Sequence, residues 1–404
     1  MISDEIQLQC TVTRKKLVKI CMAVVVLATI RLAVLLIETR QEIHTLSTHT
    51  RNVVDRPNRT ESGHRILLWI RYKSDFKIEK QRMCMQKCPV QCTLTDDKNA
   101  TADASAIVFV LTSVWAENWE LGTKKLVDLP VRRDADQVWV LSNLEPPANM
   151  FGDLAALNGI FNWTMWYRSD ADIHLPYSEP RRLTTEEAIR NIEKMKTRNI
   201  FSEKTKEITG KVSNCVDAGR RYRIVGDLQK HLNIEMYGKC YNNICGDPQN
   251  HTSCDDLTKK YKFYLALENS YCRDYVTEKY WQTLHRDQIP IVNWDYSMVS
   301  PDTVIPDSFI SLRDFRDTTA LASYIQRVSE DTDLYNRYFQ WHAEYDIQEP
   351  CATCSVCRAL HEGRPRKVVE NLEAWIANDT CPKVGVFNKW VASVDNFLFS
   401  KFGI

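Results

Sequence analysis

Residues 263–267 (FYLAL) constrain the fold of this 404-residue chain more than any other segment. Five consecutive apolar residues are typical of a strand buried on both faces, as the strands of a parallel sheet are. Glu268, Asn269 and Ser270 follow this run directly. Open α/β sheets bind their ligands at the carboxyl ends of the strands, so the run predicts an α/β fold with a ligand site after residue 267.

The residues after this strand predict a helix whose first turn binds an anion. Asp274 is typical of a helix N-cap, and a helix that starts there places Tyr275, Glu278 and Lys279 on one face of its first turns. The positive end of the helix dipole lies beside them, which suits a nucleoside diphosphate. The alternative is an ordinary buried strand followed by an amphipathic helix whose Glu278 and Lys279 are solvated.

Strands and helices alternate along most of the chain, which indicates two α/β domains. Further strands are expected at residues 106–111, 137–141, 234–237 and 289–292, and another is expected to end in residues 212–214. Thr184 and Glu187 form a capping box that opens a helix. A polar, lysine-rich passage at residues 199–210 separates the halves, so we expect an N-terminal domain at 63–205 and a C-terminal domain at 206–404.

The first 62 residues predict a membrane anchor and a stem. Residues 17–37 are mostly apolar and about long enough to span a bilayer. Basic residues flank their amino-terminal end, so the positive-inside rule places residues 1–16 in the cytosol and the chain after residue 38 in the lumen. Residues 38–62 are polar and are expected to form a stem. A cleaved signal peptide is the alternative, although no small-residue cleavage site is evident.

Two further features favour a lumenal location. Sequons for N-glycosylation occur at Asn58, Asn99, Asn162, Asn250 and Asn378. The chain has 14 cysteines, of which only Cys10 and Cys21 precede the predicted lumenal part. The remaining dozen form an even set that an oxidising compartment would largely pair.

The composition excludes some classes of function. The 53 basic and 52 acidic residues give a net charge of +1, so nothing indicates binding to nucleic acid. The chain has no P-loop and no G-x-G-x-x-G motif. A charged substrate must therefore be recognised by local groups of side chains.

Three more segments carry such groups. Residues 143–147 read NLEPP, residues 161–177 read FNWTMWYRSDADIHLPY, and residues 212–228 read VSNCVDAGRRYRIVGDL. Together with residues 261–279, and in this order, they resemble the α1,3-fucosyltransferases of glycosyltransferase family 10, whose usual acceptor-side motif is FNWT followed by YRxDSD and PYG. The resemblance covers roughly residues 62–404.

The resemblance implies a role for each matching residue. Glu145 would be the general base that takes the proton of the acceptor hydroxyl in an inverting transfer. Arg221, or else Arg223, would bind the diphosphate together with Lys279. The remaining donor-binding residues would be Asn269, Tyr275 and Glu278, and the acceptor-side motif would comprise Trp166, Tyr167, Arg168, Asp170 and Asp172. The alternatives are a solvated loop glutamate and a solvated basic helix face.

The chain departs from the family pattern at four positions, which are Pro146, Trp166, Leu267 and Ser178. None of them removes a catalytic group. Pro146 and Trp166 fall in the predicted acceptor half, so they bear on the choice of acceptor.

Two patterns suggest a metal ion. Asp170 and Asp172 form a D-x-D pair, with which many sugar-nucleotide transferases hold a divalent cation. Because the pair lies within the family motif, we expect no metal site there and no cofactor for the chemistry, although a divalent cation such as Mn²⁺ could be stimulatory.

The second pattern is Cys351, Cys354 and Cys357 with His361 nearby, which has the spacing of a zinc site. In the lumen we expect disulfides instead. The resemblance implies that Cys354 and Cys357 bond to cysteines at the start of the catalytic region, with Cys84, Cys88 and Cys92 as candidates, and the pairing stays open.

The resemblance implies a GT-B fold, with two Rossmann-like domains that face a cleft, in a single-pass type II protein of the Golgi membrane. It implies transfer of L-fucose from GDP-β-L-fucose to the 3-hydroxyl of a GlcNAc in a glycan. The acceptor stays open between the innermost GlcNAc of an N-glycan core and an outer LacNAc or LacdiNAc arm. A non-catalytic lumenal glycan-binding module of the same fold is the alternative, but it predicts loss of the charged site residues, and these are present.

Overall fold

The computed structural model describes residues 63–70, 78–118, 123–126, 129–130, 136–147, 150, 154–215, 219, 221–245, 254, 257–378 and 380–381. Apart from residues 130 and 136, they belong to one compact unit, Glu61–Leu129 with Gln137–Ile404. Within these residues no helix is both long enough and apolar enough to cross a bilayer. The expected anchor at 17–37 and stem at 38–62 lie outside the described residues.

The first sheet has six parallel strands in the order β2-β1-β3-β6-β7-β8. They are β1 (Arg65–Trp69), β2 (Thr93–Thr95), β3 (Ala106–Val110), β6 (Val138–Asn143), β7 (Trp163–Trp166) and β8 (Ile173–His174). Side chains alternate between its two faces: Ile66 and Leu68 enter one core, and Leu67 and Trp69 enter the other. Burial of both faces explains why these strands read as apolar runs.

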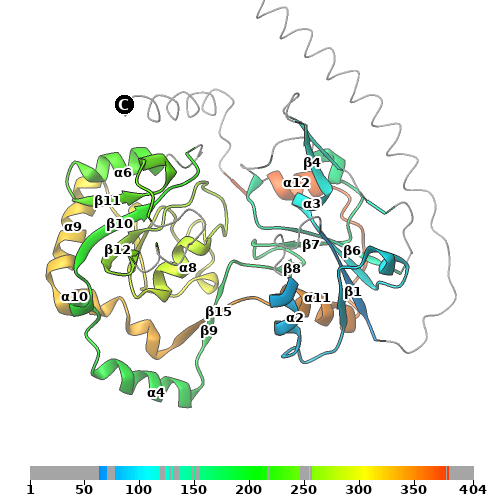
Figure 1. The fold of residues 1–404 in the computed structure, drawn as a ribbon, viewed down its shortest axis with the longest axis horizontal. Helices are drawn as coiled ribbons and strands as arrows, with labels where there is room; N and C mark the ends of the chain where they lie inside the picture. The colour runs from blue at the N-terminus through cyan, green and yellow to red at the C-terminus, as the bar shows by residue number, and fades with distance from the viewer. Residues whose placement is uncertain are drawn as a thin grey trace, which may run out of the picture. The chain divides into compact units, whose positions relative to one another are not determined.

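Helices cover both faces of this sheet (Figure 1). On one face lie α2 (Ile78–Met85) and α11 (Ala352–His361), which pack against each other. The other face holds α3 (Leu111–Val114), the 3₁₀ helix η4 (Leu154–Leu157) and α12 (Leu372–Ala377). The chain therefore returns to the first sheet after it has formed the second.

The second sheet has five parallel strands in the order β11-β10-β12-β13-β14. They are β10 (Lys206–Lys211), β11 (Ile234–Tyr237), β12 (Tyr261–Leu265), β13 (Ile289–Val292) and β14 (Ile310–Ser311). On one face pack α6 (Arg221–Gln229), α9 (Thr318–Glu330) and α10 (Thr332–Arg337), and on the other packs α8 (Glu278–His285). Phe263 and Leu265 of β12 point to the first face, and Tyr264 points to the second.

Both sheets are doubly wound in the same sense. When the strands of each sheet are numbered in chain order, both sheets begin with the order 2-1-3. The second strand therefore lies on one side of the first strand, and the third strand lies on the other side. In the second sheet this switch point lies at β10, whose neighbour on one side is β12. Ligands of open α/β sheets bind at such a point, beyond the carboxyl ends of the strands.

The remaining elements connect or flank the sheets. Two antiparallel pairs are formed by β4 (Trp115–Asn118) with β5 (Thr123–Leu126) and by β9 (Glu179–Arg182) with β15 (Tyr345–Gln348). The other helices are α4 (Thr185–Lys196), α5 (Ile200–Glu203), η2 (Lys98–Ala102), η5 (Lys239–Tyr241), η6 (Pro301–Thr303), η7 (Leu312–Asp314) and η8 (Gln340–Ala343).

The structure confirms the α/β class and most of the expected elements. β11 and β13 have the expected bounds, β3 and β6 differ from expectation by a residue or two, and Thr184 caps α4 in a box with Glu187. The domain boundary at 205/206 stays a prediction. Residues 352–377, which we assigned to the C-terminal domain, contribute Val356 and Leu372 to the cores of the first sheet.

Candidate active site

The donor loop (residues 266–277) connects β12 to α8 at the carboxyl end of the second sheet. Glu268 is buried and Asn269 is half-buried. Among the described residues, the Asn269 side-chain oxygen is buried without a hydrogen-bond partner. From the β10 side the N–H of Gly219 donates to the Asn269 carbonyl at 2.8 Å. Two neighbouring strand ends therefore meet at the residues expected to bind the donor.

The expected start of the helix after this loop was wrong. α8 begins at Glu278, and its N-cap is Thr277, whose hydroxyl accepts the Lys279 N–H. Asp274 instead has φ 59°, in the left-handed region. Tyr275 therefore precedes the helix and does not share a helical face with Glu278 and Lys279.

The reason lies in the partners of Asp274. One of its oxygens accepts the N–H of Ser169 at 3.0 Å and the Ser169 hydroxyl at 2.7 Å, and the other accepts the N–H of Ser300 at 3.0 Å. Aspartate tolerates a positive φ better than most residues because its short polar side chain hydrogen-bonds locally. The carboxylate thus ties the donor loop to the YRSD motif that follows β7.

Lys279 lies in the first turn of α8 among three acceptors. Its Nζ is 2.8 Å from the Thr277 hydroxyl and 3.2 Å from an oxygen of both Glu268 and Glu278. Burial opposes the charged form, but the two carboxylates outweigh it and raise the pKa of Lys279. The lysine is therefore cationic at neutral pH.

The two candidate arginines differ in their surroundings. Arg221 is the first residue of α6, is buried, and donates to the Asn214 carbonyl at 2.9 Å, just beyond the end of β10. Arg223 is exposed. Of the two, Arg221 lies at the switch point of the sheet.

Glu145 lies in a loop (residues 144–147) that follows β6 of the first sheet, and it is exposed. Two hydrogen bonds hold this loop. The Asn143 amide donates to the Glu145 carbonyl at 2.7 Å, and the Tyr177 hydroxyl donates to the Leu144 carbonyl at 3.0 Å. The backbone on both sides of the carboxylate is therefore fixed.

Tyr177 and Tyr275 bring the two halves of the site together. Their rings meet edge-on, with centroids 6.2 Å apart. Burial raises the pKa of Tyr177 well above its ordinary value, and the next largest contributions are the charges of Glu145, Glu278 and Glu268. A carboxylate from the first sheet and two from the second therefore act on the same phenol.

Tyr275 shares Glu145 and Glu268 with Tyr177 as neighbouring charges. Burial raises its pKa, and Tyr177, Glu268 and Glu145 contribute in the same direction. Its ring also contacts that of Tyr167, with centroids 5.1 Å apart. Tyr177 was absent from our sequence-based candidates, although its place at the end of the PY segment of the acceptor-side motif was a signal for it.

The D-x-D pair has other partners. Arg168 is buried and forms two hydrogen bonds with Asp170, at 2.8 and 2.6 Å, and Arg273 adds a third at 2.7 Å. Burial opposes ionisation, but these arginines lower the pKa of Asp170. One oxygen of Asp172 accepts both the N–H and the hydroxyl of Thr164, at 2.7 and 2.9 Å. Both carboxylates thus stabilise the loop after β7.

The aromatic residues of this motif are buried. Trp166 is 1% exposed and packs edge-on against Trp375 of α12, so it can affect an acceptor only through its neighbours. Tyr167 is equally buried, and desolvation raises its pKa. Arg168 stacks on the Trp375 ring, 4.2 Å from its centroid.

Three disulfides join α11 to α2 and to the segment after it. They are Cys84–Cys351, Cys88–Cys354 and Cys92–Cys357, and we call them the disulfide ladder. This settles the pairing that the sequence left open. Cys351, Cys354 and Cys357 follow one another at about one helical turn along the start of α11, whereas of their partners only Cys84 lies in a helix, α2.

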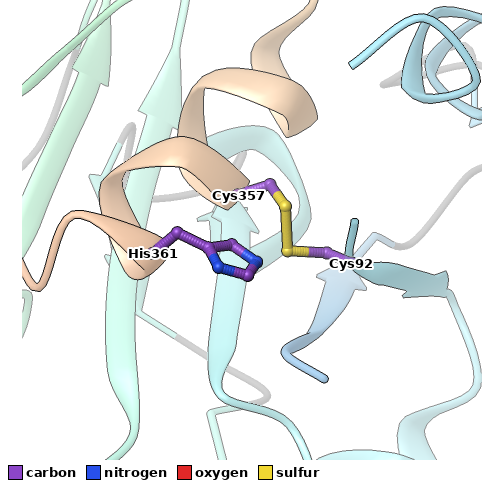
Figure 2. A group of neighbouring side chains, drawn as sticks. All are labelled: Cys92, Cys357 and His361. Carbon is purple, nitrogen blue, oxygen red and sulfur yellow. A yellow bond between two sulfur atoms is a disulfide. The ribbon is translucent and has the colours of Figure 1, made fainter. Parts of the chain in front are cut away.

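The group of side chains nearest to a zinc site includes one bridge of the disulfide ladder. Sulfur atoms of Cys92 and Cys357 and a ring nitrogen of His361 lie within 4.8 Å of one another. The two sulfurs are bonded to each other, with the His361 ring beside the bridge (Figure 2). Zinc binds thiolates, and a disulfide has none, so this group is a covalent staple.

The other cysteines of the described residues form three further bridges, Cys215–Cys240, Cys245–Cys254 and Cys272–Cys381. The last ties the donor loop to the segment after α12. Of the sequons, Asn99 and Asn378 are exposed, and Asn58 and Asn250 lie outside the described residues. Asn162 is buried, and its side chain bonds to the Trp139 N–H and the Arg366 carbonyl.

Comparison with known proteins defines the class. A model described as the C-terminal part of glycosyltransferase family 10 (fucosyltransferase) matches residues 201–375. A second, described as the N-terminal part of fucosyltransferases, matches residues 61–178. The protein is thus an enzyme of the glycosyltransferase class.

Named relatives agree with the family models. The α-(1,3)-fucosyltransferase C of Drosophila melanogaster is 31% identical over 346 residues, which cover 79% of each chain. The 4-galactosyl-N-acetylglucosaminide 3-α-L-fucosyltransferase FUT5 of Homo sapiens is 30% identical over 72% of this chain and 75% of its own. The chain therefore belongs to the fucosyltransferases of glycosyltransferase family 10.

A solved structure shows a more distant likeness. The crystal structure of an α1,3-fucosyltransferase with GDP-fucose is 13% identical, with a TM-score of 0.49, and the match covers 81% of this chain and 98% of that one.

Proposed function

We propose that this protein transfers L-fucose from GDP-β-L-fucose to the 3-hydroxyl of a GlcNAc in a glycan, with inversion at the anomeric carbon. Relatives that share about 30% of the sequence are named as α-(1,3)-fucosyltransferases, which supports the donor sugar and the linkage. The observation that carries the proposal is the contact between Tyr177 and Tyr275. Tyr177 is hydrogen-bonded to the loop that holds Glu145, and Tyr275 belongs to the donor loop, so the contact brings the two loops together.

In this mechanism Glu145 takes the proton of the acceptor hydroxyl as its oxygen attacks the anomeric carbon. The bond from that carbon to the β-phosphate oxygen breaks on the opposite face, and GDP leaves with the electron pair. Arg221 and Lys279 meet the negative charge that develops on the diphosphate. Asn269, Tyr275 and Glu278 bind the nucleotide, ribose or fucose, and Asn269 has a buried oxygen without a partner among the described residues.

The proposed overall arrangement is GT-B, with an acceptor domain at 63–205, to whose sheet residues 352–377 return, and a donor domain formed by the rest of 206–404. The doubly wound order that both sheets share supports it. The chemistry proposed needs no metal ion, because both carboxylates of the D-x-D pair are engaged by neighbouring side chains, and Mn²⁺ would at most stimulate. A signal-anchor at 17–37, a Golgi location with a lumenal catalytic part, and glycans at accessible sequons complete the proposal.

The acceptor is proposed only as a GlcNAc-containing glycan. Where the relatives' names specify an acceptor, they differ: one is a 4-galactosyl-N-acetylglucosaminide 3-α-L-fucosyltransferase, another a 3-galactosyl-N-acetylglucosaminide 4-α-L-fucosyltransferase and a third a glycoprotein 3-α-L-fucosyltransferase. Incubation of the full chain with GDP-fucose and a panel of defined glycans, followed by linkage analysis, distinguishes the N-glycan core from an outer LacNAc or LacdiNAc arm. The absence of any fucosylated product from the panel, under conditions where GDP binds, would count against catalysis.

Glu145→Gln tests the assignment of the base. Loss of a general base lowers the rate by about 10² to 10⁴, whereas the affinity for GDP, measured by calorimetry, should change little. Glu186→Gln, at an exposed position of α4, is the matched control. Undiminished turnover in the Glu145 variant would contradict the assignment of Glu145 as the general base. Arg221→Ala should weaken GDP binding and Arg223→Ala should not.

A further inference from the structure

We propose that Glu268 is a positioning residue for the donor site, which acts on the diphosphate through Lys279 and Thr277. The inference rests on the proposed function and deepens it. Glu268 stands at the start of the donor loop, and its side chain is only 2% exposed. A carboxylate this deeply buried is costly unless donors surround it, so its partners show what it does.

Among the described residues, the hydrogen-bond donors to the Glu268 carboxylate come from the start of α8. One oxygen accepts the Thr277 N–H at 2.8 Å, and the Thr277 hydroxyl lies 2.8 Å from each oxygen. The Lys279 ammonium is 3.2 Å from the second oxygen. Burial raises the pKa of Glu268, and the Lys279 charge and the Thr277 N–H oppose this. The carboxylate therefore fixes both the N-cap of α8 and the lysine two residues after it.

The backbone of Glu268 is itself held rigidly. The Asn293 side chain accepts the Glu268 N–H at 2.9 Å and donates to its carbonyl at 2.9 Å. Gly219 approaches the same carbonyl so closely that a Cβ there would lie 2.7 Å from the oxygen. Glu268 is thus a fixed point, set by β13 and by the segment before α6, against which the start of α8 is aligned.

The exposure of the three groups that accept from Lys279 suggests how the site changes when GDP-fucose binds. An ammonium group has three N–H bonds, and they face Glu268, Thr277 and Glu278. The Glu278 side chain is 50% exposed, whereas Glu268 is almost inaccessible. A phosphate oxygen can take the place of Glu278 while Glu268 and Thr277 keep the ammonium in position. A lysine held by two fixed partners loses little freedom on binding, which favours affinity.

A double-mutant cycle on the full-length protein tests this role, with GDP as the probe and calorimetry as the measurement. Glu268→Gln keeps the shape of the side chain but removes its charge. It also places an amide N–H donor where a carboxylate oxygen accepts hydrogen bonds from Thr277 and Lys279. Loss of a hydrogen bond to a charged group corresponds to a roughly ten- to hundredfold weaker GDP affinity. In the Lys279→Ala background, the same change should weaken GDP binding by less than about threefold, because two groups that act as a unit are non-additive.

Kinetics and stability separate positioning from a purely structural role. We expect Glu268→Gln to raise the KM for GDP-fucose more than it lowers kcat, and Glu268→Asp to restore part of the affinity. Glu207→Gln is the matched control, because it removes the carboxylate partner of Lys262, another buried lysine of the same sheet, at 3.1 Å. It should lower the melting temperature without changing GDP affinity.

Three outcomes overturn the inference. Wild-type GDP affinity in Glu268→Gln does so directly, and so does an equal loss of affinity in the presence and absence of Lys279. In both cases the wild-type protein still binds GDP and transfers fucose, so the proposed function stands. If the wild-type protein neither binds GDP nor transfers fucose, the proposed function fails and the inference fails with it.

Discussion

The three bridges of the disulfide ladder should stabilise the protein unequally, although each joins residues 265 to 267 positions apart. A bridge restricts the unfolded chain by an amount that grows with the loop it closes. A first bridge closes the whole loop and contributes about 5 to 6 kcal/mol at 25 °C in the chain-entropy model. Once that bridge is formed, a neighbouring bridge closes only the short ring between the two, which has about four residues on one strand of the ladder and three on the other, roughly seven in all. It adds about 2 kcal/mol.

Stepwise removal of the bridges in the fragment 61–404 measures these contributions. Alanine replaces both cysteines of Cys84–Cys351 first, since both are half-buried, then those of the middle bridge, and finally those of Cys92–Cys357. The expected losses in the free energy of unfolding are about 2, about 2 and about 5 to 6 kcal/mol. Their total of about 10 kcal/mol is comparable with the entire stability of a typical domain. Urea unfolding under non-reducing conditions, followed by tryptophan fluorescence, gives each value.

The order of the losses is the decisive result. If the first bridge removed costs as much as the last, the loops are independent and the reasoning is refuted. The same steps taken in the reverse order are the control, because the nested-loop argument depends on how many bridges remain and not on which ones. A last bridge that costs only about 2 kcal/mol would show that the unfolded chain stays compact without it.

Two further predictions follow from single residues. Gly219→Ala places a Cβ 2.7 Å from the backbone of the donor loop, so we expect the affinity for GDP, measured by calorimetry, to fall about tenfold. Gly226→Ala is the control, because a Cβ there meets nothing within 4 Å, and it should leave the affinity unchanged. Equal effects of the two changes would exclude a local clash as the cause. Asp287→Asn keeps a residue suited to φ 50° but loses the charge that bonds to His342 at 2.8 Å and Arg198 at 2.6 Å, so urea unfolding at pH 7 should show a loss of about 2 kcal/mol. Burial opposes the ionised form of Asp287, but these partners lower its pKa below the ordinary 3.8. The loss should therefore persist at pH 5 and should shrink as the pH falls below 3.8; a loss that disappears between pH 7 and pH 5 would point to another group.

The elements that the sequence predicted well are those whose signals are local. Apolar runs such as residues 289–292 indicated buried strands because both faces of a parallel sheet are covered. The capping box at Thr184 needs only residues within one helical turn, and it was confirmed. The chemistry of the site was also local, since the side chains of residues 268–279 are close together in the chain.

The errors and omissions have distant causes. Asp274 is a plausible N-cap by residue type, but its carboxylate bonds to Ser169, 105 positions away, and so Thr277 caps the helix instead. Tyr177 was overlooked because its role depends on contacts with Leu144 and Tyr275. The return of residues 352–377 to the first sheet leaves no mark in their own periodicity.

By itself, the sequence determined the α/β class, the residues of the candidate donor site and the family, because short motifs and strand patterns depend on neighbours in the chain. Only the tertiary structure decided how the cysteines pair, where α8 begins and how the loop of Glu145 meets the donor loop through Tyr177 and Tyr275. These depend on which strand ends and helices become neighbours when the cores pack. That choice is made by burial of side chains hundreds of residues apart, which no local pattern records.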